Sequence, residues 1–191
     1  MAAFSEKQGD DVAEVIRTRR TIHNFEPGPV PPTDEILAAI DLARWAPNHH
    51  LTEPWHFYLL GPETVESVAR YNAELYAETR GEKAGEAKFK RWRAIPGWIV
   101  VTCRRSEDMH RQQEDYAACC CAVYALQLYL WARGIGVKWT TGPVTQTDRF
   151  FEIVGIDRDA EMLVGLIWYG YASDVPVTRR KPVKELLTWR P

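Results

Sequence analysis

Three arginines and two threonines stand together in the run Arg17-Thr18-Arg19-Arg20-Thr21. A phosphate group accepts hydrogen bonds from both side-chain types, and the planar guanidinium adds a permanent positive charge. The run therefore indicates a phosphate site at the end of a helix. A solvent-exposed basic helix end explains the same residues equally well, because cations there complement the helix dipole. A second basic run, Thr178-Arg179-Arg180-Lys181-Pro182, leaves the same two possibilities open.

Two further segments carry polar and aromatic groups beside glycine or proline. The stretch Lys138-Trp139-Thr140-Thr141-Gly142 can present an indole ring, two hydroxyls and free backbone amides, although an ordinary edge strand and turn would have the same composition. The loop after Pro47 holds Asn48-His49-His50. Two adjacent histidines are a weak signal for a metal, because no third ligand has suitable spacing. We expect no metal site.

Motifs for a serine nucleophile, a zinc protease or a phosphate-binding loop do not occur in the sequence. The phosphate-binding and aromatic residues also come without an acid–base pair. This pattern is typical of an enzyme in which a cofactor carries the chemistry and the protein positions it. We therefore predict no catalytic side chain.

The elements that must position these residues follow from hydrophobic periodicity and from glycine and proline breaks. Helices are predicted over 11–20, 33–46, 63–93, 112–133 and 147–154, and strands over 55–60, 98–103, 137–141 and 163–171. Strands and helices mix without strict alternation, which favours an α+β layer fold. The length of 191 residues suits a single domain over 11–191 that follows a flexible tail of residues 1–10. The charged segment 63–93 is predicted to be a helical excursion that acts as a lid.

The segment from Tyr116 to Ala132 is apolar apart from Gln127. It is shorter than the roughly 20 residues needed to cross a bilayer, and a helix that is apolar all round is normally buried. The sheet of so small a chain covers only one side of this helix. We therefore predict a fully buried helix between the sheet and a second subunit, since large apolar interfaces are typical of obligate homodimers.

Composition restricts the function classes. A net charge of −2 argues against a nucleic-acid-binding protein. The polar N-terminal residues lack the apolar core of a signal peptide. Three of the four cysteines are adjacent, which is a poor basis for disulfides, so we expect reduced, buried cysteines in a cytoplasmic protein with no membrane partner. Eight tryptophans are more than the core needs and favour a pocket or interface for a flat ligand.

The order of these segments resembles the nitroreductase family. IRTRRTIHNFEPGPVP and ILAAIDLARWAPNHHLTEPWHFYLL match its N-terminal pattern of Arg-Arg-Ser, a Pro-Val-Pro linker, a helix, an Ala-Pro loop and a Gln-Pro-Trp strand start. The apolar helix, GIG, KWTTG, GLIWYGY and the basic tail follow in order, so the resemblance covers about residues 12–186. APNHH, EPWHF and KWTTG are most similar to the minimal nitroreductases, which lack long insertions.

This resemblance implies a homodimer with FMN at its interface, on a mainly antiparallel central sheet flanked by helices. Arg19, Arg20 and Thr21 match the residues that hold the phosphate and ribityl chain. Arg180, in preference to Lys181, matches a late basic arm on the phosphate. The residues that would reach the flavin are Trp45, Asn48 and His49 from the partner subunit, and Trp139, Thr140, Thr141 and Gly142 from the strand end.

Three positions depart from the family pattern. Thr21 replaces the usual serine but keeps the hydroxyl. Glu53 replaces the usual glutamine, so no contact is assigned to it. His23 stands where many members have Arg or Lys near the flavin; it could stabilise reduced flavin as a cation or as a neutral donor. A plain strand-edge histidine is the alternative.

The function implied is an FMN-dependent oxidoreductase. It would transfer hydride from NAD(P)H, the co-substrate, to a small oxidised acceptor of the nitroaromatic, quinone or enone type in a ping-pong reaction. A flavin-binding protein without NAD(P)H turnover (a carrier, a sensor or a flavin-consuming enzyme) is the alternative. A structural or interaction domain with basic termini is a third hypothesis.

Overall fold

One four-stranded sheet forms the centre of the molecule in a computed structural model that describes residues 5–190. The strands are β1 (Trp55–Leu59), β2 (Gly97–Arg104), β3 (Gly136–Thr140) and β4 (Glu161–Gly170). They lie in the order β1-β2-β4-β3, and each neighbouring pair is antiparallel. The four strands and the mainly antiparallel sheet predicted from the sequence are confirmed.

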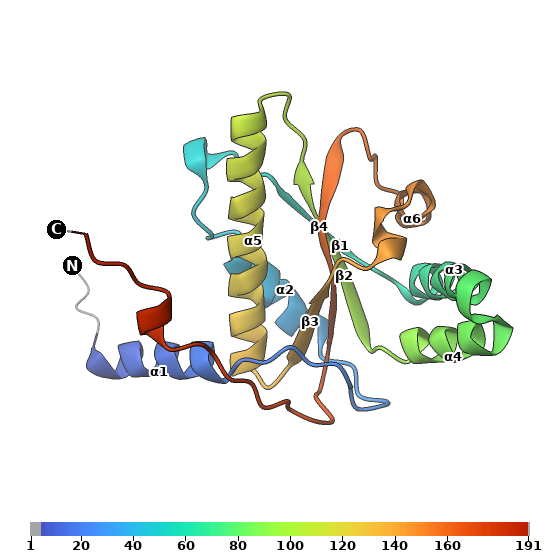
Figure 1. The fold of residues 1–191 in the computed structure, drawn as a ribbon, viewed down its shortest axis with the longest axis horizontal. Helices are drawn as coiled ribbons and strands as arrows, with labels where there is room; N and C mark the ends of the chain where they lie inside the picture. The colour runs from blue at the N-terminus through green and yellow to red at the C-terminus, as the bar shows by residue number, and fades with distance from the viewer. Residues whose placement is uncertain (1–4, 191) are drawn as a thin grey trace.

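Helices cover both faces of this sheet (Figure 1). They are α1 (Glu6–Thr18), α2 (Thr33–Ala43), α3 (Pro62–Arg80), α4 (Glu82–Arg93), α5 (Met109–Ala132) and α6 (Asp148–Val154). Short 3-10 turns occur at His49–Leu51 (η1), Pro143–Gln146 (η2) and Val183–Glu185 (η3). The helix α5 lies along one face with α2 packed against it, and α3, α4 and α6 lie on the other.

Alternation along β2 divides the core into two layers, because successive side chains of a strand point to opposite faces. Ile99 and Val101 pack toward α5, whereas Trp98 and Val100 pack toward α3 and α4. The sequence of β2 is apolar at nearly every position for this reason, since both of its faces are covered.

The first helix begins earlier than predicted. We placed residues 1–10 in a flexible tail, but α1 starts at Glu6. The side chain of Ser5 accepts from the backbone N–H of Gln8, and the side chain of Gln8 accepts from the N–H of Ser5. This capping box supplies partners for the free amides of the first turn. The prediction for residues 1–4 lies outside the described residues.

The charged segment 63–93 is helical, as predicted, but forms a hairpin of two helices, α3 and α4, that meet at Gly81 (φ 83°). Its inner side is part of the core, where Phe89 and Trp92 are buried against the sheet. Gly85 allows close approach, since a Cβ there would lie 2.8 Å from the Ala73 carbonyl oxygen. A lid role for the outer side of the hairpin stays a prediction.

The single chain covers only one side of α5, so its burial between the sheet and a second subunit stays a prediction. Its inner face, with Cys119, Val123 and Leu126, is completely covered. Its outer face leaves Cys121 and Tyr124 exposed, the latter by 40 %. The helix is apolar on both sides although the sheet covers only one of them. All four cysteines have free thiols, as expected. The expectation that all of them are buried is wrong at Cys121, which is exposed on the outer face of α5.

Candidate functional site

Four arginine side chains surround one cavity of about 320 Å³. Arg17, Arg19 and Arg20 come from the end of α1 and the residues after it, and Arg180 comes from the C-terminal segment. Ile16, Tyr124 and Thr178 complete the lining, which contains no carboxylate. Guanidinium groups gathered without a counter-charge bind an anion well, and paired N–H donors match the geometry of phosphate. The two basic runs of the sequence therefore meet at one cavity whose lining suits an anion.

The position of this cavity is fixed where α1 meets α5 and β3. Trp131 of α5 donates its indole N–H to Thr18 Oγ1 at 3.0 Å, and an Arg19 guanidinium nitrogen lies 3.4 Å from Gln127 Oε1. Arg20 donates to the Arg17 carbonyl at 2.7 Å, which satisfies one of the free carbonyls at the helix end. The backbone then turns beside β3, where Thr21 bridges Val137 in parallel.

The structure also separates the two basic tail residues. Arg180 lines the arginine cavity, whereas Lys181 is exposed and lies outside the lining. The expected contact of Arg180 with a phosphate stays a prediction.

The strand end Trp139-Thr140-Thr141-Gly142 lies at the other end of β3. Thr141 is four residues beyond Val137, which places it about 13 Å along the strand from the Thr21 bridge. A phosphate at the arginines and a ring system at the strand end would therefore share one edge of the sheet. Trp139 is half-buried; its indole N–H donates to the Val164 carbonyl at 3.0 Å.

The ring of Trp139 has a specific space in β4. A Cβ added to Gly165 would lie 2.0 Å from Nε1 of Trp139, so only glycine at position 165 permits the indole to pack there. The expectation of a freely presented ring face is therefore too simple. Much of the ring belongs to the core beside α5, and a ligand at the strand end would meet Thr140, Thr141, Gly142 and the ring's remaining edge.

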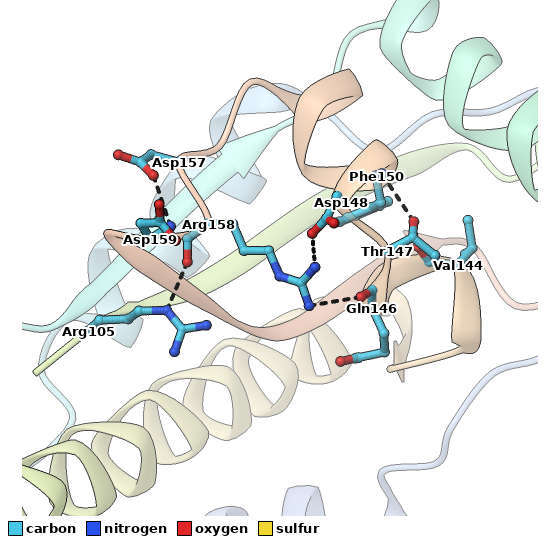
Figure 2. Close-up of polar contacts among 9 residues, drawn as sticks. All are labelled: Arg105, Val144, Gln146, Thr147, Asp148, Phe150, Asp157, Arg158 and Asp159. Atoms are coloured by element: carbon cyan, nitrogen blue, oxygen red, sulfur yellow. Dashed lines mark hydrogen bonds and ion pairs between the residues drawn. The ribbon is translucent and has the colours of Figure 1, made fainter.

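The turn after β3 holds the strand end in place. The Gly142 carbonyl accepts from both the backbone N–H and the Oγ1 of buried Thr145. Figure 2 shows how the following α6 is tied to β4: Arg158 reaches Asp148 and donates to the Gln146 carbonyl at 3.1 Å. Arg105, next to β2, donates to the Arg158 carbonyl at 2.8 Å. These contacts leave Thr141 and Gly142 little freedom to move.

The third predicted group lies on the loop between α2 and β1. Trp45 is 75 % exposed, with the Arg44 guanidinium 5.7 Å from its ring centroid. Asn48 accepts from the Glu53 N–H at 3.0 Å. His49 Nδ1 lies 2.9 Å from Glu114 Oε2 on α5.

This loop has a costly backbone conformation. His50, Leu51 and Glu53 have positive φ values of 58°, 51° and 42°. Such angles cost non-glycine residues about 1–3 kcal/mol each and are common at functional sites. Thr52 bonds to Asp115 at 2.5 Å, and Arg104 donates to the Thr52 carbonyl at 3.1 Å. These contacts maintain the strained loop.

An ion pair fixes the helix that carries this loop. Arg133 at the end of α5 contacts Glu35 of α2 at 2.5 Å, and Tyr129 donates to the same carboxylate at 3.3 Å. The hydrogen bond and the charge of Arg133 lower the pKa of Glu35 from its ordinary value, so the pair is ionised at neutral pH.

Within one chain the loop and the arginine cavity do not meet. His49 contacts α5 at residue 114, whereas Arg19 contacts it at residue 127. At 1.5 Å per residue these points are about 20 Å apart along the helix. The structure thus brings Arg19, Arg20 and Arg180 together, puts Thr21 beside β3, and leaves Trp45, Asn48 and His49 elsewhere. His23 is exposed two residues after Thr21.

Sequence reasoning missed several residues of these groups. Arg17 and Thr178 stand in the basic runs but were not assigned to the site, although both line the cavity. Tyr124 and Glu114 come from α5, and neither carries a motif. Helical spacing alone could have suggested them, because it places both residues on the less buried side of α5.

Comparisons with known proteins identify the family of this chain. A sequence model of the nitroreductase family matches residues 16–171. The chain belongs to the nitroreductase family. A relative in Bacillus subtilis (strain 168), named "Putative NAD(P)H nitroreductase YfhC", is 30 % identical over 181 residues, 92 % of each chain.

Solved structures show the fold of this nitroreductase-family chain. The nitroreductase-like family protein from Bacillus cereus superposes with a TM-score of 0.83 at 28 % identity, over 100 % of this chain and 98 % of that one. A structure from Desulfovibrio desulfuricans, crystallised with FMN, gives 0.74 at 21 % identity, over 94 % of this chain and 96 % of that one. The nitroreductase-like fold expected from the sequence is confirmed.

Among residues 5–190, no group of three or more histidine, cysteine or acidic side chains is arranged to hold a metal ion. None of the described helices is both long enough and apolar enough to cross a membrane.

Proposed function

We propose that this nitroreductase-family chain is an FMN-dependent oxidoreductase that takes hydride from NAD(P)H and passes it to a small oxidised acceptor. The observation that carries the proposal is the cavity of four arginines at one end of β3, with Thr140, Thr141 and Gly142 at the other. The relatives named as NAD(P)H nitroreductases and the FMN-bound neighbour support the choice of cofactor and co-substrate.

The residues fit FMN by their chemistry. A phosphate monoester needs cationic donors and no nearby carboxylate, and the arginine cavity meets both conditions. The ribityl chain and ring need hydroxyl and backbone donors along one edge, which the segment from Thr21 and the strand end offer. FMN, when bound, supplies the hydride chemistry itself.

We further propose that the site is completed by a second copy. The outer face of α5 carries an apolar stripe at helical spacing, of Ala117, Cys121, Tyr124 and Leu128. A twofold interface is self-complementary, so two such helices would cross antiparallel near Cys121. Residue Glu114 of one copy would then lie opposite Leu128 of the partner subunit. This brings the loop of His49 to the arginine cavity of the other chain, which no single chain achieves.

The exposed arms favour the same dimer. The helix α1 has no buried residue, and the C-terminal segment exposes Val177 by 94 % and Trp189 by 85 %. In Figure 1 both extend from the body on the same side. Apolar side chains held so far from their own core would be covered by a partner.

The chain's own residues then have three tasks in catalysis. Arg19, Arg20 and Arg180 hold the phosphate end. Thr140, Thr141 and Gly142 orient the ring end, and the Trp139 indole closes the wall beneath them. Trp45, Asn48 and His49 would approach from the partner subunit and exclude water. Rate enhancement comes from orientation and electrostatics, so no side chain forms a covalent bond.

Nitroaromatics, quinones and enones are the acceptor classes that we propose. A cytoplasmic location suits the free thiols.

Anaerobic mixing tests the proposal. The purified protein is expected to be yellow, with one FMN per chain, and to lose its flavin absorbance within seconds of mixing with NADH or NADPH. Addition of a quinone should restore the absorbance. Retention of FMN without bleaching by either nucleotide would instead favour the carrier, sensor or flavin-consuming alternative. A colourless protein that takes up no FMN would overturn the proposal.

A further inference from the structure

A carboxylate on α5 controls the orientation of His49. Glu114 Oε2 lies 2.9 Å from Nδ1 of His49, while its other oxygen lies 3.4 Å from Nε2 of His110, one helical turn earlier. The His49 ring also stacks on His50, with ring centroids 3.9 Å apart. His49 is thus held on one edge by a carboxylate and on one face by a second imidazole, although its side chain is largely exposed.

This contact determines which ring nitrogen carries the proton. The hydrogen bond from His49 lowers the pKa of Glu114. An ionised carboxylate only accepts hydrogen bonds, so Nδ1 of His49 must donate. In the neutral imidazole Nε2 is then an acceptor, and none of the hydrogen bonds or ion pairs among the described residues uses it.

The surroundings of the ring preserve this arrangement. From α5 the groups facing it are Glu114 and His110, and from β2 the guanidinium of Arg104 binds the loop carbonyl of Thr52. Asp115 is engaged by Thr52 at 2.5 Å and is not free to compete for the imidazole. His50, which has a φ of 58°, stacks its ring on His49, and His49 contacts Glu114 on α5.

We infer that Glu114 is a positioning residue for His49, holding the imidazole in the Nδ1–H form so that Nε2 offers an acceptor to a ligand donor group at the partner's site. The inference deepens the proposed function and rests on it, because His49 reaches a ligand only across the proposed dimer. The ligand group it suits is a hydroxyl or N–H of the bound FMN or of the acceptor substrate.

The first test reads the tautomer directly. Protein as purified, labelled with ¹⁵N-histidine, is examined by long-range ¹⁵N–¹H correlation at about pH 8, where histidine is neutral. His49 should show the Nδ1–H pattern in the wild type and change to predominantly Nε2–H in Glu114→Ala. The matched control is Gln113→Ala, an exposed neighbour on the same helix, which should leave the His49 signals unchanged. An unchanged tautomer in Glu114→Ala overturns the inference.

The second test asks whether Glu114 acts through His49. In Glu114→Ala the dissociation constant for FMN should rise about tenfold, which corresponds to about 1.4 kcal/mol. In a His49→Ala background the same substitution should change it by less than about twofold, as expected when one residue acts only through the other. Additive effects, or an unchanged constant in the single variant, overturn the inference.

Failure of the proposed function would look different. A wild-type protein that binds no FMN would defeat that function whatever the tautomer of His49. A defect confined to Glu114→Ala, in a wild type that binds and reduces FMN, bears on the positioning role alone. Thermal unfolding of each variant checks that folding is intact.

Discussion

The chain covers the apolar side chains on the two sides of the sheet to different extents. On the side of α3, α4 and α6, the rings of Trp92, Trp98 and Trp168 lie 5.0–5.6 Å apart and are almost completely buried. Among the described residues of those three helices, only Tyr76 is a large exposed hydrophobic side chain. On the side of α5, large apolar groups remain exposed on α1, α2, the loop 45–51, α5 and the C-terminal segment. We call the side of α3, α4 and α6 the closed face, because the chain covers it by itself. We call the side of α5 the open face, because its apolar side chains stay exposed and would be covered by the proposed partner subunit.

This difference separates stability from function. The closed face carries the tryptophan cluster and none of the arginines that line the arginine cavity. The open face carries those arginines, the strained loop and the apolar stripe of α5. Substitutions on the closed face should therefore change unfolding at any protein concentration. Substitutions on the open face should change cofactor binding or association instead.

The largest effect is expected on the closed face. Trp92→Ala removes an indole that contacts two other tryptophans and is 7 % exposed. Removal of a buried aromatic ring should lower the free energy of unfolding by about 3–5 kcal/mol. Urea unfolding at two protein concentrations measures it, and the loss should be equal at both. Trp189→Ala, at an exposed position, is the control; a similar loss there would break the comparison.

On the open face, Cys121→Glu should dissociate the proposed dimer. The substitution puts two carboxylates together where the α5 helices cross, and like charges facing each other in an interface cost several kcal/mol. Sedimentation velocity at micromolar concentration should show a folded monomer. Cys121→Ser, which adds no charge, should stay dimeric. A dimer that persists in Cys121→Glu would mean that the stripe on α5 is not the interface.

The Cys121 case shows how far the sequence reaches. All four strands and five helical segments could be predicted, because β-branched and aromatic runs and glycine breaks are local signals, but the division of 63–93 into two helices was missed. The helix 116–132 was correctly read as apolar on both sides. The sequence could not tell which side of this helix the rest of the chain covers. That depends on how distant elements pack against the helix.

The site shows the same limit. The arginine runs could be found from residue type alone, and family resemblance assigned them to a phosphate. That Arg17 and Tyr124 line the same cavity depends on where α1 meets α5, which no local pattern encodes. The contact between His49 and Glu114 joins positions 65 residues apart. The Trp139 ring was expected to be free. The sequence did not show that the ring packs over Gly165, because Gly165 lies on a different strand, β4.

A smaller effect should distinguish two adjacent cations on the open face. Arg180→Ala removes a guanidinium from the cavity and should raise the dissociation constant for FMN by about 10–100-fold, because hydrogen bonds to charged groups contribute about 1.5–3 kcal/mol. Lys181→Ala should change it by less than about twofold, since Lys181 lies outside the lining. Fluorescence titration of FMN measures both. Equal effects would indicate general charge attraction instead of a shaped site.

Alkaline pH should report on the closed face. The phenol of Tyr58 donates to Glu161 at 2.9 Å, and burial, followed by Glu161, raises the pKa of Tyr58 to about 12. An unfolded tyrosine titrates near about pH 10. The folded state therefore keeps its proton longer, and this contribution to stability is present below pH 10 and lost between about pH 10 and 12. Tyr58→Phe should flatten the fall in unfolding free energy over that range. Parallel curves for the two proteins would contradict this.

The smallest effect concerns His23, at the edge between the two regions. It lies between Thr21, which bridges Val137, and Phe25, which bridges Ala172. The family resemblance places an Arg or Lys near the flavin at this position. The exposure of His23 leaves the imidazole free to donate a hydrogen bond to a bound ring. A donor there stabilises the anionic reduced flavin, so His23→Ala should lower the reduction potential by about 20 mV, the two-electron equivalent of about 1 kcal/mol. Dye-equilibrated redox titration measures it. An unchanged potential would make His23 an ordinary strand-edge residue and would restrict the ring end to the backbone and threonines of the strand.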